Sequence, residues 1–308
     1  MRRNRLALLE LHSAVFLFGL AGLFGKWLTL APLVIVFGRT AFASLALPAV
    51  LLIMRQPLAR HWRTIPGWLV LSGAVLAFHW ATFFHSIQVS TVAIGVLTYS
   101  TFPLFVTFLE PFFFKERWRW LDLATAALVL AGLALIVPGF DVGNNVTRGV
   151  FWGTMSGFSF AVLSLLNRRL VAAHPPMVLA AGQNLVAAVV LLPFIFNQAP
   201  WPAARDILLL GVLGVVCTAL AHVLFIGSLS HMRAQLASVV AGLESVYGIL
   251  FAFLLLGEVP AGRTLLGGAV ILSAVVLATL KRHESSGAFS HAGFPERTNP
   301  ERKSKSRR

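Results

Sequence analysis

The residues of this chain that could do chemistry are a few charged or titratable side chains set inside long apolar runs. Arg39, Glu110 and Glu244 are charged residues of this kind, and His79 and His222 are titratable ones. A charge near the centre of a lipid bilayer costs about 2.5–3.5 kcal/mol on insertion scales, so such residues usually face a protein interior or a water-filled cavity. We therefore expect these side chains to mark a site between helices.

Glu244 is the strongest candidate for a functional carboxylate. It lies one turn before Tyr247 and about ten residues into the apolar run 235–256, so we expect it near mid-depth. There it could bind the cationic group of a solute or carry a proton, because an ionisable residue inside the membrane is by default a functional candidate. The alternative is a carboxylate that only bonds a neighbouring helix.

Glu110 and Arg39 are charges nearer the ends of their runs. Tyr99 and Glu110 share one helical face at positions i and i+11, so Glu110 could line an inner vestibule. The alternative for Glu110 is an interfacial ion pair with Lys115 or Arg117. Arg39 could contact a substrate or couple its movement, but we favour a structural clamp on helix ends or a side chain that snorkels to the interface.

The histidines lie next to aromatic and polar side chains. His79 precedes Trp80 in its run, and a histidine could relay a proton or form a hydrogen bond with a substrate. Alternatively, each histidine is bonded to a backbone carbonyl or a serine across a helix pair. Ser156 shares a helical face with Trp152 and Ser159. We predict that the cavity is lined by His79, Trp80, Tyr99, Ser156, His222, Glu244 and Tyr247.

Several chemistries lack the residues that they need. The histidines in the apolar runs have no metal-ligand spacing, and Cys217 is the single cysteine, so neither a disulfide nor a cysteine-based metal site can form within the chain. The sequence contains no His-Glu-x-x-His, no Gly-x-Ser-x-Gly and no Walker A motif, and the aspartates within the apolar runs, Asp122 and Asp206, lie among the first three residues of their runs. We therefore expect no enzymatic activity, no cofactor and no metal.

The composition is that of a membrane protein. Hydrophobic residues make up 57% of the 308 residues and charged residues 12%, with a mean hydropathy of +0.81. In soluble domains about 45–50% of the residues are apolar and about 25% are charged. A helix of about 20 residues crosses the hydrocarbon layer, and backbone groups in lipid must be satisfied internally. Ten runs fit this requirement: 9–28, 33–54, 66–86, 92–113, 120–138, 149–167, 177–196, 206–226, 235–256 and 264–281.

The ten runs form one five-run pattern that occurs twice. The shift of 142 residues that moves Glu116 onto Glu258 aligns the copies without a gap and places Trp80 on His222. Because five is odd, the second copy must enter the membrane from the opposite side. We predict an all-α polytopic membrane protein with ten transmembrane helices as two inverted five-helix repeats. The repeats are 9–138 and 149–281, between a cytoplasmic N-terminus at 1–8 and a disordered basic cytoplasmic tail at 282–308.

The distribution of basic residues predicts the orientation. With the N-terminus inside, the inside segments carry 20 Lys and Arg residues, the outside segments carry four, and Arg39 falls within a run. Basic residues accumulate on the cytoplasmic side, so both termini are expected in the cytoplasm and the chain in the inner (plasma) membrane. The net charge of +14 is then a topology signal. The expected partners are a small-molecule substrate and the lipid bilayer, with no nucleic acid.

Two related motifs close the fourth and ninth runs, TFPLFVTFLEPFFFKE at 101–116 and LESVYGILFAFLLLGE at 243–258. An apolar helix follows each of them, and FGLAGLFGKW and PLVIVFGRTAFA occur in the first two runs. With these motifs, the chain resembles the EamA-type family of the drug/metabolite transporter superfamily over about residues 9–281. One departure is Ser245, which stands where the first copy has Pro103. The resemblance implies transport of a small metabolite, usually export, by alternating access around a central cavity.

We therefore predict a secondary transporter that exports an amino acid or amine-like solute across the inner membrane. A phosphate ester would need several intramembrane Lys or Arg residues, and Arg39 is alone. The alternatives are a membrane-embedded enzyme, whose clustered catalytic groups are missing, and a channel-like facilitator, which would usually depend on oligomer symmetry. The fifth and tenth runs are uniformly apolar and would face lipid or the second copy of a homodimer.

Overall fold

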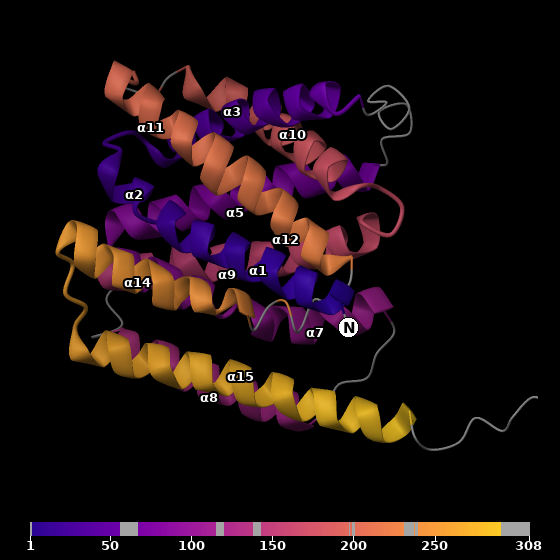
Figure 1. Cartoon of the computed structure of the whole chain (residues 1–308). Coiled ribbons are helices and arrows are strands. Elements are labelled where there is room, and N and C mark those ends of the chain that lie inside the picture. The colour runs from indigo at the N-terminus through magenta and orange to yellow at the C-terminus, as the bar shows by residue number, and fades with distance from the viewer. Residues whose placement is uncertain are drawn as a thin grey trace, which may run out of the picture.

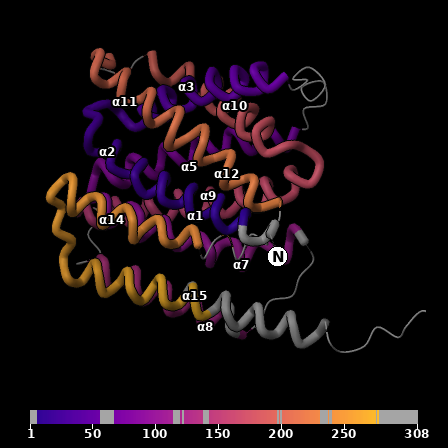
Figure 2. The backbone as a smooth tube through the Cα atoms, in the orientation of Figure 1, coloured from indigo at the N-terminus to yellow at the C-terminus, as the bar shows by residue number. Residues whose placement is uncertain are grey.

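The computed structural model of the chain describes residues 2–55, 67–114, 120–137, 143–196, 198, 201–230, 237 and 240–290. Within these residues the regular secondary structure is entirely helical, with no strand. This agrees with the predicted all-α polytopic fold class. The helices lie side by side with similar axis directions, and the start of the first helix lies at the same end of the molecule as the end of the last one (Figures 1 and 2).

The helices follow the predicted runs closely. In the first half they are α1 (Arg2–Ala21), α2 (Phe24–Trp27), α3 (Pro32–Ile53), α5 (Gly67–Val89), α6 (Val92–Tyr99), α7 (Phe102–Phe114) and α8 (Trp120–Ile136). In the second half they are α9 (Asn145–Leu170), α10 (Pro176–Ile195), α11 (Ala204–Gly214), the π-helical segment η1 (Val215–Leu220), α12 (Ala221–Leu229), α14 (Leu243–Leu256) and α15 (Gly262–Ser290). Prolines open α3 and α10, because a first-turn residue needs no N–H donor. The helix α15 continues past residue 281, where we expected the polar tail to begin.

Seven helical stretches are long and apolar enough to cross a membrane. They are Leu6–Trp27, Pro32–Ile53, Gly67–Val89, Val92–Phe113, Asn145–Leu170, Pro176–Ile195 and Ala204–Leu229. Three shorter apolar stretches are Leu123–Ile136, Leu243–Leu256 and Gly262–Ala274. Each of these stretches overlaps one of the predicted runs.

Two predicted spans are interrupted rather than continuous. The run 92–113 divides at Ser100, because Pro103 has no N–H to donate to the carbonyl of Tyr99. The chain also turns at Gly242, and α14 begins one residue later. Glu244 therefore lies in the first turn of α14, which corrects the expectation that it lies about ten residues into one continuous helix. Ser100 and Gly242 are separated by the same shift of 142 residues that aligns the two copies.

The helices α8 and α15 form a close pair at one edge of the molecule (Figure 1). A Cβ atom on Gly132 would lie 2.6 Å from Ile271 Cγ1, and one on Gly267 would lie 2.7 Å from Ile136 Cγ1. Glycine is therefore needed at both positions for this close approach. The contact on α15 moves backward as the contact on α8 moves forward, so these two helices run antiparallel.

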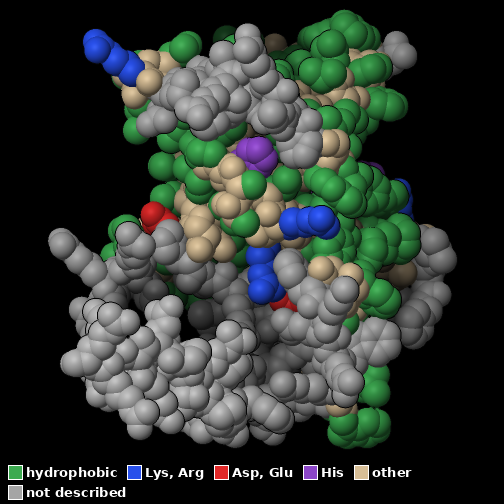
Figure 3. Space-filling model, turned by 90° about the vertical axis from the view of Figure 1, so that its right-hand side faces the viewer, with side chains coloured by type: hydrophobic (Ala, Val, Ile, Leu, Met, Phe, Trp, Pro, Cys, Tyr) green, Lys and Arg blue, Asp and Glu red, His purple; other side chains and the backbone are tan. Residues whose placement is uncertain are grey.

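Hydrophobic side chains cover much of the described surface. Leu45 is 72% exposed, Ile53 82% and Phe112 73%, which suits contact with lipid. Figure 3 looks onto the helix ends where the N-terminus lies, and Lys and Arg side chains are more prominent there than Asp and Glu.

Candidate functional site

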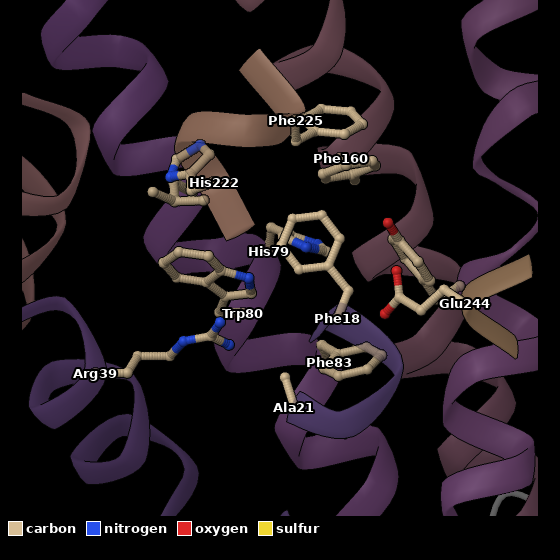
Figure 4. A pocket seen from close by; sticks show the side chains of 12 residues that line it. Phe18, Ala21, Arg39, His79, Trp80, Phe83, Phe160, His222, Phe225 and Glu244 are labelled. Atoms are coloured by element: carbon tan, nitrogen blue, oxygen red, sulfur yellow. The ribbon is translucent and has the colours of Figure 1, made fainter. Parts of the chain in front are cut away.

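One buried cavity lies where α1, α3, α5, α6, α9, α12 and α14 meet. It is lined by Phe18, Ala21, Arg39, Leu76, His79, Trp80, Phe83, Tyr99, Phe160, His222, Phe225 and Glu244 (Figure 4). The free space between these side chains is about 20 Å³, room for one or two water molecules. The cavity is therefore too small for a metabolite in this conformation, and a solute could enter only after the walls move apart.

Arg39 is held in a fixed orientation at one wall of this cavity. Its side chain is 1% exposed, Nε donates a hydrogen bond to Thr218 Oγ1 at 2.8 Å, and Nη2 donates to the Cys217 carbonyl at 3.4 Å. The guanidinium carbon lies 3.8 Å from the centroid of the Trp80 ring, a cation–π contact. None of the described residues accepts a hydrogen bond from Nη1. Arg39 is therefore a buried part of the cavity, which corrects the expectation of a side chain that snorkels to the interface.

A π-helical segment supplies the partners of Arg39. In η1, the Thr218 hydroxyl donates to the carbonyl of Leu213 five residues earlier, at 2.7 Å, and accepts from Arg39. A Cβ atom on Gly214 would lie 2.8 Å from the Arg39 carbonyl, so glycine allows α11 to approach α3 closely. Such π-bulges occur frequently at functional sites. Sequence reasoning predicted neither the bulge nor the hydrogen bond from Arg39 to Thr218, because the apolar run gave no sign of them.

The hydrogen-bond partners of His79 determine which ring nitrogen carries its proton. Nδ1 lies 2.8 Å from Ser156 Oγ and 3.1 Å from the Ser156 carbonyl, and the Ser156 hydroxyl donates to the His79 carbonyl. A carbonyl only accepts, so Nδ1 carries the proton and Nε2 remains an acceptor. Ser156 thus lies behind His79 and orients it; it does not line the cavity.

His222 has the opposite arrangement. Its Nδ1 lies 3.2 Å from Asn184 Nδ2, an amide nitrogen that also donates to the Ala180 carbonyl. Because that amide can only donate, Nδ1 of His222 accepts and the proton is on Nε2. The His222 ring packs edge-on against Trp80 with the centroids 5.8 Å apart. The two histidines therefore offer an acceptor and a donor, and two residues aligned by the repeat are in contact.

Glu244 is the carboxylate of the cavity. It is 4% exposed, and the Tyr99 hydroxyl lies beside it as a hydrogen-bond donor. The neighbouring Ser245 hydroxyl donates to the Val96 carbonyl at 2.7 Å and lies 2.5 Å from Ser100 Oγ. These contacts join the two helix interruptions and fix the turn that carries Glu244. Arg39 and Glu244 lie on different walls (Figure 4), and no salt bridge joins them.

Two predicted residues lie elsewhere. Tyr247 does not line the cavity but packs edge-on against Phe16, with centroids 5.5 Å apart. Glu110, 1% exposed, forms an ion pair with Arg168 of α9. Lys115 and Arg117, the predicted partners of Glu110, lie outside the described residues, so that pairing stays a prediction. The structure brings six candidates to the cavity, with Ser156 directly behind one of them; the six are Arg39, His79, Trp80, Tyr99, His222 and Glu244.

Aromatic rings form the remaining walls. Phe160 lies 4.9 Å from His79, 5.3 Å from Tyr99 and 5.4 Å from Phe225, measured between ring centroids. Phe18 packs against Phe225 at 5.9 Å. Sequence reasoning did not single out Phe18 or Phe160, since the chain contains 25 phenylalanines and only packing distinguishes those that face the cavity. Among the described residues no group of three or more His, Cys, Asp or Glu side chains could hold a metal ion.

Known proteins similar to this chain match it over most of its length. A sequence model described as the EamA-like transporter family matches residues 6–137 and 147–280. An uncharacterized transporter of Bacillus subtilis is 22% identical over 91% of this chain and 92% of its own length. The pseudopaline exporter CntI of Pseudomonas aeruginosa is 27% identical over 80% of this chain and 86% of its own length.

An S-adenosylmethionine uptake transporter of Rickettsia bellii is 24% identical over 67% of this chain and 70% of its own length. One solved crystal structure superposes with a TM-score of 0.68, covering 90% of this chain and 98% of that one at 20% identity. This structural similarity concerns the fold alone.

Proposed function

Because this chain belongs to the EamA-like transporter family, we propose that it is a secondary transporter that exports an amino acid or amine-like metabolite by alternating access. Membership makes it a multi-pass membrane transporter of a small molecule, and not an enzyme. One observation carries the proposal furthest: a central buried cavity with aromatic walls holds an arginine and a carboxylate that are not paired with each other. Such a cavity suits a small amphipathic solute.

We further propose ten transmembrane helices in two inverted repeats, 9–138 and 149–281. Three observations support this arrangement. The equivalent helices α8 and α15 run antiparallel, the equivalent residues Trp80 and His222 are in contact, and the helix interruptions occur at equivalent positions. Carriers built in this way bind their substrate near the midplane, where the repeats meet.

Both termini are proposed to be cytoplasmic, in the inner membrane. The 20-to-4 distribution of basic residues supports this orientation. The described chain also begins and ends at one end of the molecule, and that end displays Lys and Arg side chains (Figures 1 and 3). The outward face of α8, with Leu130 62% exposed, would contact lipid or a second copy in a homodimer.

The names of two relatives support transport of a small molecule. One is a pseudopaline exporter and another takes up S-adenosylmethionine. The two relatives are named for opposite directions of transport, so the proposal of export rests on the family resemblance. A channel-like facilitator remains the competing function, but a central cavity with free space for only one or two waters favours a carrier over an open pore.

Solute flux into proteoliposomes tests the proposed function. The purified protein should accelerate the uptake of a labelled amino acid or amine when the vesicles are preloaded with the same unlabelled solute. A carrier shows this counterflow and saturates, whereas a channel shows neither trans-stimulation nor saturation at low solute concentration. Repeating the assay with and without a pH gradient tests proton coupling. Absence of flux for every solute in a broad metabolite panel would contradict the proposal.

A further inference from the structure

The cavity holds a basic and an acidic side chain. Neither forms a salt bridge with a described residue, and each acts on the other electrostatically only from across the cavity. Arg39 is 1% exposed and Glu244 is 4% exposed. Within the described part of the chain, the one salt bridge is the pair Arg168–Glu110, far from both along the sequence. Burial of an unpaired charge is unfavourable unless something else compensates it. The missing partners are therefore expected to come from whatever occupies the cavity.

The Arg39 wall is arranged to receive an anion. Hydrogen bonds to Thr218 and Cys217 use Nε and Nη2, which leaves Nη1 without an acceptor among the described residues. The guanidinium is also fixed against the face of Trp80. A preorganised planar guanidinium recognises a carboxylate well, because little side-chain freedom is lost on binding. His222 lies beside Trp80 at the same wall and keeps a proton on Nε2.

The Glu244 wall is arranged to receive a cation. The carboxylate lies across the cavity from Arg39, with Phe18 and Phe83 between them (Figure 4). Aromatic faces attract cations as well as apolar groups. His79 retains an unprotonated Nε2, which can accept a hydrogen bond from an ammonium group. The donors of Arg39 thus lie at one wall and the carboxylate of Glu244 at another, with phenylalanine rings between them (Figure 4).

We propose that the transported solute is a zwitterion whose carboxylate binds Arg39 and whose cationic group binds Glu244, with its apolar part against the phenylalanines. This inference rests on the proposed function and narrows it. A plain amine would satisfy Glu244 and leave Arg39 buried without an anion. A plain carboxylate would do the reverse. Both single-charge solutes are therefore rejected, and Arg39 determines specificity rather than only clamping helix ends.

Matched solute triplets test this proposal. Each triplet contains an amino acid, the amine without its carboxylate, and the acid without its amino group. The first is phenylalanine, phenethylamine and 3-phenylpropionate; the second is leucine, 3-methylbutylamine and 4-methylpentanoate; the third is methionine, 3-methylthiopropylamine and 4-methylthiobutanoate. Binding to the purified full-length protein is measured as the shift in thermal unfolding temperature, and transport as counterflow. The expected result is a shift and counterflow for at least one amino acid and neither for its two matched analogues.

Variants that remove one charge test which cavity residue binds each charged group of the solute. Glu244→Gln should lose the preference for the amino acid and gain binding of the matched acid, because only the anion is still needed. Arg39→Gln should gain binding of the matched amine instead. Glu10→Gln, which removes a carboxylate of α1 outside the cavity, is the control and should keep the wild-type preference. If either cavity variant fails to fold, the triplets on the wild-type protein still decide the question.

Several results would overturn the proposal. One is a matched amine or acid that binds the wild-type protein as well as its amino acid does. Another is the absence of any effect of all three amino acids at millimolar concentration. A third is a Glu244→Gln variant that keeps the wild-type preference. Flux of some other, singly charged metabolite would support the proposed transporter function but contradict the zwitterionic substrate. The experiment therefore distinguishes failure of one proposal from failure of the other.

Discussion

At the scale of residues, the cavity depends on a few side chains whose partners fix their direction. Arg39 is held by Thr218 and the Cys217 carbonyl, and each histidine is fixed in one tautomer by its own neighbour. A preoriented polar group loses little entropy when it binds a ligand. The neighbours should therefore influence affinity even where they do not touch the solute.

Glu244→Gln is the most direct residue-scale test. It removes the charge that we assign to the cationic end of the solute while keeping shape and hydrogen bonding. A hydrogen bond to a charged group contributes about 1.5–3 kcal/mol, so transport of the physiological solute should fall by about 10- to 100-fold. The amount of protein in the membrane should be unchanged, because removal of a buried charge does not destabilise the fold. Normal transport by this variant would rule out an essential charge at position 244.

Thr218→Val tests whether orientation of Arg39 matters. The substitution keeps the shape but removes the oxygen that accepts from Arg39 Nε. We expect a KM raised by roughly 10-fold or more, since one charge-assisted hydrogen bond is lost, while the expression level stays normal. Thr40→Val is the matched control, because the Thr40 hydroxyl bonds only carbonyls of its own helix. Equal effects of the two substitutions would show that Thr218 has no special role.

At the scale of elements, the sequence predicted the helices well and their interruptions poorly. The repeat and the apolar runs were sufficient to place His79, Trp80, Tyr99, His222 and Glu244 at similar depth, because a helix of known length fixes the depth of each residue. The bulge in η1 and the turn at Gly242 depend on packing between distant segments. So does the position of Tyr247, since α14 begins later than expected and turns that ring toward Phe16.

Two cationic side chains outside the cavity are related by the repeat. The shift of 142 residues places Lys26 on Arg168. Lys26 donates to the Ser90 carbonyl at 2.7 Å, and Glu258 nearby accepts from the Val92 backbone N–H at 3.0 Å. Glu258 therefore caps the start of α6. Arg168 pairs with Glu110. Both cationic side chains thus take part in polar contacts that join different elements.

Arg168→Gln should weaken the contact between α9 and α7. The pair Arg168–Glu110 joins α9 to α7, so its loss favours conformations in which the cavity faces the side of the N-terminus. Under the proposed orientation, a cysteine in the cavity should become more reactive toward a reagent added from the cytoplasmic side, by several-fold, and less reactive from the other side. Arg169→Gln, at the neighbouring position of α9, is the control. Unchanged reactivity from both sides would show that the Arg168–Glu110 pair does not restrict access to the cavity from the cytoplasmic side.

At the scale of the whole molecule, the orientation has a simple test. Reporter fusions in the 138–144 connection and after residue 290 should report opposite sides of the membrane, with the second in the cytoplasm. This follows from an odd number of spans between the two positions in the ten-helix arrangement. Two reporters on the same side would contradict the inverted repeat.

The central claim is that the cavity around Arg39 and Glu244 opens alternately to the two sides of the membrane. Ala21 lines this cavity and is small, so Ala21→Cys in a Cys217→Ala background introduces a thiol with little disturbance; the Cys217 backbone carbonyl that binds Arg39 is retained. Ala14→Cys, on the same helix but in the packed core, is the control.

The decisive measurement is the reaction of this cysteine with a membrane-impermeant thiol reagent added to intact cells and to inverted vesicles. We predict that the cysteine at position 21 reacts from both sides and that a transported solute slows this reaction. The control cysteine at position 14 should not react. Alternating access would be contradicted if the thiol at position 21 were inert from both sides. It would also be contradicted if the thiol reacted from one side only, whatever the solute or pH gradient across the membrane.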